Sequence, residues 1–215
     1  IYPPVFSIEE MKGRYIEEEK RNIIISVGRF FVGSHCKKQL DMASFFVHNP
    51  EKFLDYEYHI VGSVSERKED REYLRQVKEL AEQSGNIYVH VNCGYEELMA
   101  LYRAAKIFWH ATGYGIDENR EPEKTEHFGI TTVEAMSFGA VPVVINKGGQ
   151  KETVEDGING YRWDNEKECV EKTCRLIEDD SLRKRMAAES MERAREYSVE
   201  KYDRLNKEVF HELKI

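Results

Sequence analysis

The stretch "NIIISVG", residues 22–28, decides how the rest of the chain is interpreted. Three isoleucines follow one another without the polar alternation of a strand that has one face in water. A short, uninterrupted apolar run that ends in glycine is typical of a strand buried on both faces, as in parallel sheets that helices cover on either side. We therefore predict a buried parallel strand at this position.

Strand and helix patterns alternate along the sequence that follows. The sequence predicts further strands at 56–63, 86–91, 106–111, 140–145 and 160–163, and helices at 37–48, 66–85, 95–105, 131–139, 149–156 and over most of the chain from about 165. Such alternation predicts an α/β fold, a doubly wound, Rossmann-like parallel sheet. Ligands of these folds bind at the carboxyl ends of the strands, so the turns after the strands are where function is expected.

Composition excludes several functional classes. The 215 residues include 32 basic and 40 acidic side chains, for a net charge of −8, whereas non-specific nucleic-acid binders are normally basic. No apolar run approaches the roughly 18 residues that a membrane span needs. The four cysteines show no CxxC spacing, and the histidines, His110 and His127 among them, form no HxxxH pair. We predict reduced thiols, no metal, no nucleic-acid partner and no transmembrane segment.

Basic residues follow the first strand in "SVGRFFVGSHCKKQ" (26–39). Gly28 and Arg29 come directly after the strand, and Lys37 and Lys38 are predicted to begin the next helix. A cation at such a turn, together with free amides at a helix N-terminus, forms an anion site. Solvated surface charge is the alternative. Neither GxGxxG nor GxxxxGK[ST] is present, so the stretch predicts neither a dinucleotide fingerprint nor a P-loop.

Two acids, Glu126 and Glu134, bracket a Phe128-Gly129 turn in "EHFGITTVEA" (126–135). Thr131 and Glu134 have the spacing of a capping box, which would explain Glu134 alone and leaves a ligand role equally open. Carboxylates accept hydrogen bonds from vicinal hydroxyls, and amides at a helix start suit phosphate. With the cations of the first turn, the stretch predicts a site for a compound that combines sugar, phosphate and ribose.

Two further stretches carry weaker signals. Gly148-Gly149 begins another predicted helix after a strand, or simply makes a tight turn. Pro3-Pro4 fixes a stiff, extended segment before the first strand, as in an interdomain linker. Because the chain also starts without methionine, we expect it to be a piece of a longer enzyme.

In their order along the chain, these stretches resemble the C-terminal, donor-binding half of a GT-B glycosyltransferase of the retaining family 4 kind. The matching pieces are "IYPPV", "ISVGRF" with Lys37, "YHIVGS", "VNCGYEELMALYRAAKIFWHAT", "EHFGITTVEAMSFGAVPVV" and "GGQKETVEDGINGYRW". The E-x7-E pattern around Phe-Gly is the most specific. The resemblance implies an interdomain linker at 1–20, a Rossmann-like donor-binding domain at 21–195, and a C-terminal helix at 196–215 that packs back on a missing N-terminal domain.

The resemblance also implies a role for each site residue. Arg29 and Lys37 would hold the donor diphosphate and stabilise the leaving group, Glu126 would contact hydroxyls of the donor sugar, and these three are the predicted catalytic residues. Glu134 would hydrogen-bond the ribose. The other predicted donor-binding residues are Gly28, Lys38, Gly62, Ser63, Val64, Val91, Asn92, Phe128, Gly129, Ile130 and Thr131.

The implied function is transfer of a sugar, with retention, from a nucleoside-diphosphate sugar, without a metal or other cofactor. The acceptor, a glycan or glycolipid, would be bound by the missing half, in polysaccharide, lipopolysaccharide or glycolipid synthesis. The implied location is cytoplasmic, with peripheral attachment of the full-length protein to the inner face of the membrane as an option. The isolated chain is expected to lack full activity. Two alternatives stay open: a nucleotide-sugar epimerase and a non-catalytic nucleotide-sugar-binding module.

Overall fold

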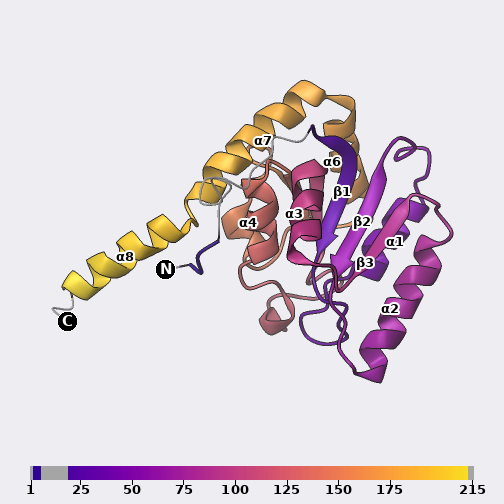
Figure 1. The fold of residues 1–215 in the computed structure, drawn as a ribbon, viewed down its shortest axis with the longest axis horizontal. Helices are drawn as coiled ribbons and strands as arrows, with labels where there is room; N and C mark the ends of the chain where they lie inside the picture. Colours follow the sequence, from indigo (N-terminus) through magenta and orange to yellow (C-terminus); the bar gives the residue numbers. More distant parts are fainter. Residues whose placement is uncertain (1, 6–18, 213–215) are drawn as a thin grey trace.

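A computed structural model describes residues 2–5 and 19–212, which form one parallel sheet with helices on both faces (Figure 1). Its strands are β1 (Arg21–Val27), β2 (Glu57–Gly62), β3 (Ile87–Val91), β4 (Ala105–His110), β5 (Val141–Ile145) and β6 (Tyr161–Trp163). Its helices are α1 (Gln39–Val47), α2 (Lys68–Ala81), α3 (Tyr95–Ala104), α4 (Ile130–Ser137), α5 (Gln150–Thr153), α6 (Glu166–Glu178), α7 (Asp180–Arg195) and α8 (Val199–Glu212), with a 3₁₀ turn at Pro122–Lys124.

The strand order is β3-β2-β1-β4-β5-β6, and all neighbours are parallel. The opening stretch therefore lies in the middle of the sheet, with Ile24 opposite Tyr58 of β2 and Ile107 of β4. This order confirms the doubly wound, Rossmann-like fold expected of one half of a GT-B enzyme. The chain direction across the sheet reverses between β1 and β4, which is where such folds bind their ligands.

Each face of the sheet has its own apolar core, which explains the uninterrupted isoleucines. Ile24 points into one core, with helices α1, α2 and α6, while Ile23 and Ile25 point into the other, with α3 and α4. All three are fully buried. In the first core the rings of Phe46 and Phe53 stack with centroids 4.8 Å apart. Because both faces of this strand are covered, its side chains are mostly apolar, and the one buried polar side chain, Ser26, is hydrogen-bonded to Tyr58.

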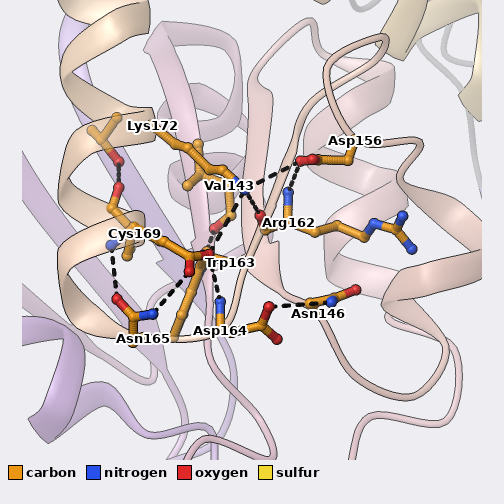
Figure 2. Close-up of polar contacts among 11 residues, drawn as sticks. Val143, Asn146, Asp156, Arg162, Trp163, Asp164, Asn165, Cys169 and Lys172 are labelled. Carbon is orange, nitrogen blue, oxygen red and sulfur yellow. Dashed lines mark hydrogen bonds and ion pairs between the residues drawn. The ribbon is translucent and has the colours of Figure 1, made fainter.

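The short edge strand β6 is fixed by side-chain hydrogen bonds to its neighbours (Figure 2). Trp163 donates from Nε1 to the carbonyl of Val143, at 3.2 Å, and the backbone amide of Arg162 donates to Asp156 Oδ1, at 2.7 Å. The side chain of Asn165 caps α6 by accepting from the amide of Glu168. These contacts complete the sheet on the side away from the predicted site.

The N-terminal segment, residues 2–5, packs against the junction of α7 and α8. The amide of Val5 donates to the carbonyl of Tyr197 at 2.8 Å, and Tyr2 stacks on Phe128 with ring centroids 5.3 Å apart. From this junction α8 extends away from the rest of the domain (Figure 1), and it exposes Val209 and Phe210. Most of the predicted linker, residues 1 and 6–18, lies outside the described residues. None of the helices described here is long and apolar enough to cross a membrane.

Candidate functional site

Backbone hydrogen bonds join the carboxyl ends of β1, β2 and β3 into one surface, which we call the strand-end shelf (Gly28, Gly62–Val64 and Asn92). The amide of Gly28 donates to the carbonyl of Val61, at 2.9 Å, and the amide of Asn92 donates to that of Gly62, also at 2.9 Å. A Cβ on Gly62 would lie 2.1 Å from the Gly28 carbonyl oxygen, so this approach requires glycine. Asn92 Oδ1 accepts from the amide of Val64 at 3.2 Å.

The shelf contains five of the residues predicted for the donor, Gly28, Gly62, Ser63, Val64 and Asn92. Val91, another predicted residue, is half-buried and ends β3 directly beside it. The structure therefore brings these predicted residues together at the expected edge of the sheet.

Among the described residues, Arg29 contacts an aromatic ring and not the predicted acids. Its exposed guanidinium packs over the ring of Phe31, 5.5 Å from the centroid, and the guanidinium of Arg67 lies at the same distance from that ring. No ion pair joins Arg29 to either acid of the E-x7-E motif in the part of the chain that the structure describes. The sequence interpretation missed Arg67, although its place just before α2, after β2, gave the same signal as Arg29.

The two lysines do not begin a helix, and that prediction was wrong. Helix α1 begins at Gln39, and Lys38 precedes it in the left-handed region, with φ 58°. This conformation turns the neighbouring side chains in different directions: Lys37 forms an ion pair with Glu126, whereas Lys38 lies close enough to Asp41 to lower the pKa of that carboxyl against the effect of burial. Lys37 is thus the lysine that joins the site.

Glu126 is the centre of a cluster of charged and polar groups between the ends of β1 and β4. Its Oε2 accepts a hydrogen bond from Lys37 Nζ and lies 3.1 Å from His110 Nε2. Thr112 Oγ1 lies 3.2 Å from the same His110 nitrogen. Only 15% of the Glu126 side chain and 22% of the Lys37 side chain are exposed. The ion pair is therefore partly shielded from water but open to a ligand.

This cluster holds Glu126 in its charged form. Burial alone would raise the pKa of Glu126, but the hydrogen bond and charge of His110 and the ammonium of Lys37 outweigh it and hold the pKa well below its usual range. Burial lowers the pKa of His110, against the opposing effect of Glu126. A charged carboxylate beside a neutral imidazole is what this arrangement provides at neutral pH.

Helix α4 begins at Ile130, after Gly129 with φ 91°, and this corrects the capping box predicted from Thr131 and Glu134. No side chain caps this helix start. The Glu134 carboxylate instead accepts a hydrogen bond from the hydroxyl of Tyr102, on α3, at 2.9 Å. The capping interpretation failed because the N-cap is the left-handed Gly129, two residues before Thr131.

Glu134 and Tyr102 form an electrostatic environment unlike that of Glu126. Burial raises the pKa of Glu134, and the Tyr102 hydroxyl only partly offsets this effect. Tyr102 is fully buried, stacks on Phe138 with centroids 5.7 Å apart, and has a pKa raised by the same burial. Tyr102 is a second residue that the sequence interpretation missed, because nothing in an apolar helix pattern marks its contact with α4.

The segment between the two acids contains the other predicted residues. Phe128 is buried between Tyr2 and Tyr197, so its ring supports the turn rather than facing solvent. Ile130 is 48% exposed. The amides of Ile130 and Thr131 belong to the first turn of α4, where N–H groups have no intrahelical acceptor. These amides are available to an anion.

The turn after β5 holds the backbone of Glu126 in place. The amide of Gly149 donates to the Glu126 carbonyl at 2.7 Å. The loop at 112–125, which follows β4, is tied to the same turn, because Glu118 accepts from the amide of Gly148, at 3.1 Å, and Lys147 Nζ donates to the carbonyl of Gly113, at 3.2 Å. Gly148 and Gly149, which gave only a weak signal in the sequence, therefore bind the backbone of Glu126 and the side chain of Glu118 through their amides.

The donor set of the site suits hydroxyls and anions. In the described ranges no group of three or more His, Cys, Asp or Glu side chains is arranged to hold a metal ion. Four cysteines are free thiols, of which Cys169 is buried. The site offers a ligand the ammonium of Lys37, the carboxylate of Glu126 and the uncharged first-turn amides of α4, which suit phosphate and sugar hydroxyls.

Comparison with protein families decides the affiliation of the chain. The family model described as "Glycosyl transferases group 1" matches residues 7–193. The chain belongs to the group 1 glycosyltransferases. Among curated members of this kind, the "GDP-Man:Man(3)GlcNAc(2)-PP-Dol alpha-1,2-mannosyltransferase" of Caenorhabditis elegans is 26% identical over 198 residues, which cover 86% of this chain and 39% of that protein. The enzyme of the same name from Dictyostelium discoideum is 26% identical over 72% of this chain and 30% of its own length.

Solved structures show the same fold. The C-terminal domain of a group 1 family glycosyl transferase, LpcC, from Francisella tularensis matches with a TM-score of 0.66, 20% identity and coverage of 84% of this chain and 88% of that one. A glycosyltransferase from Rickettsia africae matches with a TM-score of 0.72 and 21% identity, over 91% of this chain and 48% of that one. This glycosyltransferase chain thus spans well under half the length of the curated relatives above.

Proposed function

We propose that this chain binds a nucleoside-diphosphate sugar and forms the donor half of a retaining hexosyltransferase. The observation that carries the proposal is the ion pair of Lys37 with Glu126. It lies between the ends of β1 and β4, where the strand order reverses, beside the first-turn amides of α4. It places a cation for the diphosphate next to a carboxylate for a hydroxyl. Membership of the group 1 glycosyltransferases supports this assignment.

In the proposed complex, each group has one task. The base lies along the strand-end shelf, the ribose hydroxyls donate to Glu134, and the diphosphate takes Lys37 and the amides of Ile130 and Thr131. A diphosphate competes with Glu126 for the ammonium of Lys37, and Glu126 then accepts a sugar hydroxyl. The fixed cation and amides neutralise the departing diphosphate without a metal.

The acceptor is assigned to the part of the protein outside this chain. The curated relatives are more than twice as long as their match, and α8 extends from the domain with Val209 and Phe210 exposed (Figure 1). We assign this face of α8 to contact with an acceptor-binding half of the same polypeptide. A glycan or lipid-linked glycan is the acceptor class, since the mannosyltransferases above are named for a lipid-linked one.

Calorimetric titration of the chain with GDP, UDP and ADP, and then with the matching sugar nucleotides, tests the proposal. GDP and GDP-mannose come first because two relatives are named for GDP-mannose. We expect saturable binding of one nucleoside diphosphate and of its sugar form. Absence of binding to all of them, by a chain that is folded by circular dichroism, would contradict the proposed donor site.

A further inference from the structure

His110 is a buried polar residue to which the sequence assigns no role. It is the last residue of β4 and is 3% exposed, and its Nε2 lies 3.1 Å from Glu126 Oε2. A carboxylate has no proton to donate, so Nε2 must carry the hydrogen of this contact. Thr112 Oγ1, at 3.2 Å, lies close enough to accept a share of the same hydrogen.

The other ring nitrogen has no competing task among the described residues. His110 Nδ1 is buried and has no hydrogen-bond partner there. With Nε2 protonated and the ring neutral, Nδ1 keeps a lone pair and donates nothing. The single N–H of the ring is therefore committed to Glu126. Burying a polar ring is unfavourable unless its hydrogen bonds compensate, and only one of the two nitrogens is compensated here.

The two oxygens of Glu126 are consequently unequal. Oε2 receives both Lys37 and His110. Oε1 has no hydrogen-bond partner in the described part of the chain and is the oxygen left for a ligand. When a diphosphate takes Lys37 away, the hydrogen bond from His110 remains to hold Oε2.

We propose that His110 is a positioning residue that fixes Oε2 of Glu126, so that Oε1 accepts a hydroxyl of the donor sugar. The inference rests on the proposed function for the identity of that hydroxyl, but not for the hydrogen bond itself. His110 acts through Glu126 and touches no donor atom. Its loss therefore affects recognition of the sugar and leaves recognition of the nucleoside diphosphate unchanged.

Three variants test this role. His110→Phe keeps an aromatic ring and removes the N–H. His110→Gln places an amide N–H where Nε2 was and should restore the hydrogen bond to Glu126. His59→Phe is the matched control, since His59 is also buried in the sheet and its Nε2 lies 3.1 Å from a carboxylate oxygen, Glu57 Oε2. The first readout is the pKa of Glu126, measured by NMR of its carboxyl carbon. The second is the ratio of the Kd for the nucleoside diphosphate to the Kd for its sugar form.

In His110→Phe we expect the pKa of Glu126 to rise and the sugar nucleotide to bind about tenfold more weakly, which is about 1.4 kcal/mol, with no change for the diphosphate. His110→Gln should recover most of both effects, and His59→Phe should change neither. An unchanged Glu126 pKa in His110→Phe, or an equal loss for both ligands, would overturn the inference. If the wild-type chain binds neither ligand, the proposed function fails, while the carboxyl titration still decides the role of His110.

Discussion

The two acids of the E-x7-E motif, eight positions apart, lie in opposite electrostatic environments. Glu126 is on an irregular segment between Lys37 and His110, and these partners hold its pKa below the usual range despite burial. Glu134 is on a helix with one neutral partner, Tyr102, and burial raises its pKa. The comparison teaches that one motif combines a carboxylate that stays charged with one that is protonated at a higher pH than an ordinary glutamate.

Removing Lys37 should have the largest effect on this comparison. Lys37→Met takes away the cation next to Glu126, and we expect nucleoside-diphosphate affinity to fall about 30-fold, since a charge-assisted contact contributes about 1.5–3 kcal/mol. The pKa of Glu126 should rise in the same variant, while that of Glu134 should not move. Calorimetry and NMR of the carboxyl carbons measure the two effects.

Lys38→Met is the matched control for this prediction. The neighbouring lysine lies near Asp41 and makes no ion pair with Glu126 in the described structure. A change of less than about threefold in affinity is expected, because a surface charge contributes little. Equal losses from the two variants would mean that the cations act only through the general positive potential of the turn.

Much of this arrangement was predictable from the sequence, and the exceptions have physical causes. Continuous apolar runs such as "NIIISVG" identified the buried strands and hence the sheet edge where ligands bind. Local patterns also located Glu126 and Glu134. They could not identify His110 or Tyr102 as partners of these acids, because hydrogen bonds between segments 16 and 32 residues apart depend on packing rather than on local pattern.

The incorrect predictions concerned where two helices begin. The lysines and Thr131 were expected to lie at helix starts, but Lys38 and Gly129 both adopt a left-handed conformation that shifts where the helix begins. For Lys38 no sequence signal announced this conformation, since positive φ is uncommon for residues other than glycine. For Gly129 the signal was present, because glycine is the default residue there.

Removing the Tyr102 hydroxyl tests how far this single partner keeps Glu134 charged and in place. In Tyr102→Phe we expect the pKa of Glu134 to rise further and nucleoside-diphosphate affinity to fall about three- to fivefold, because the carboxylate is less fixed and less often charged. Stability should fall by about 1 kcal/mol for one lost buried hydrogen bond, as measured by urea unfolding.

Tyr58→Phe provides the control for that variant. Tyr58 is fully buried in the other core, and its hydroxyl lies 2.9 Å from Ser26 Oγ. It should cost similar stability and leave both nucleotide affinity and the pKa of Glu134 unchanged. If Tyr58→Phe weakened binding as much as Tyr102→Phe, the effect would come from general destabilisation rather than from Glu134.

The smallest expected effect is the pH dependence of binding. Burial raises the pKa of Glu134, so its carboxylate takes up a proton at a higher pH than an ordinary glutamate does. Glu126, whose pKa is lowered, stays charged at that pH. As the pH is lowered from neutral toward the range where glutamates titrate, nucleoside-diphosphate affinity should therefore fall a few-fold more steeply in the wild type than in Glu134→Gln. Parallel pH profiles would contradict the assignment of Glu134.

The same shifts have opposite consequences for stability. The lowered pKa of Glu126 contributes stability above the pKa of an unfolded glutamate, and this contribution is lost as the pH falls through the folded value. The raised pKa of Glu134 instead costs stability at neutral pH, and this cost disappears as the carboxyl is protonated. Urea unfolding of Glu134→Gln should accordingly show a gain in stability at pH 7 that shrinks as the pH is lowered.

One measurement tests the central claim most directly: a paired titration of Glu126→Gln and Glu134→Gln with a nucleoside diphosphate and with its sugar form. We predict that Glu134→Gln weakens both ligands by the same factor, about tenfold. Glu126→Gln should weaken the sugar form alone, and the diphosphate should bind at least as tightly as before because Lys37 is released from its ion pair. If the two variants lost affinity for both ligands in the same proportion, the two acids would not serve different parts of the donor.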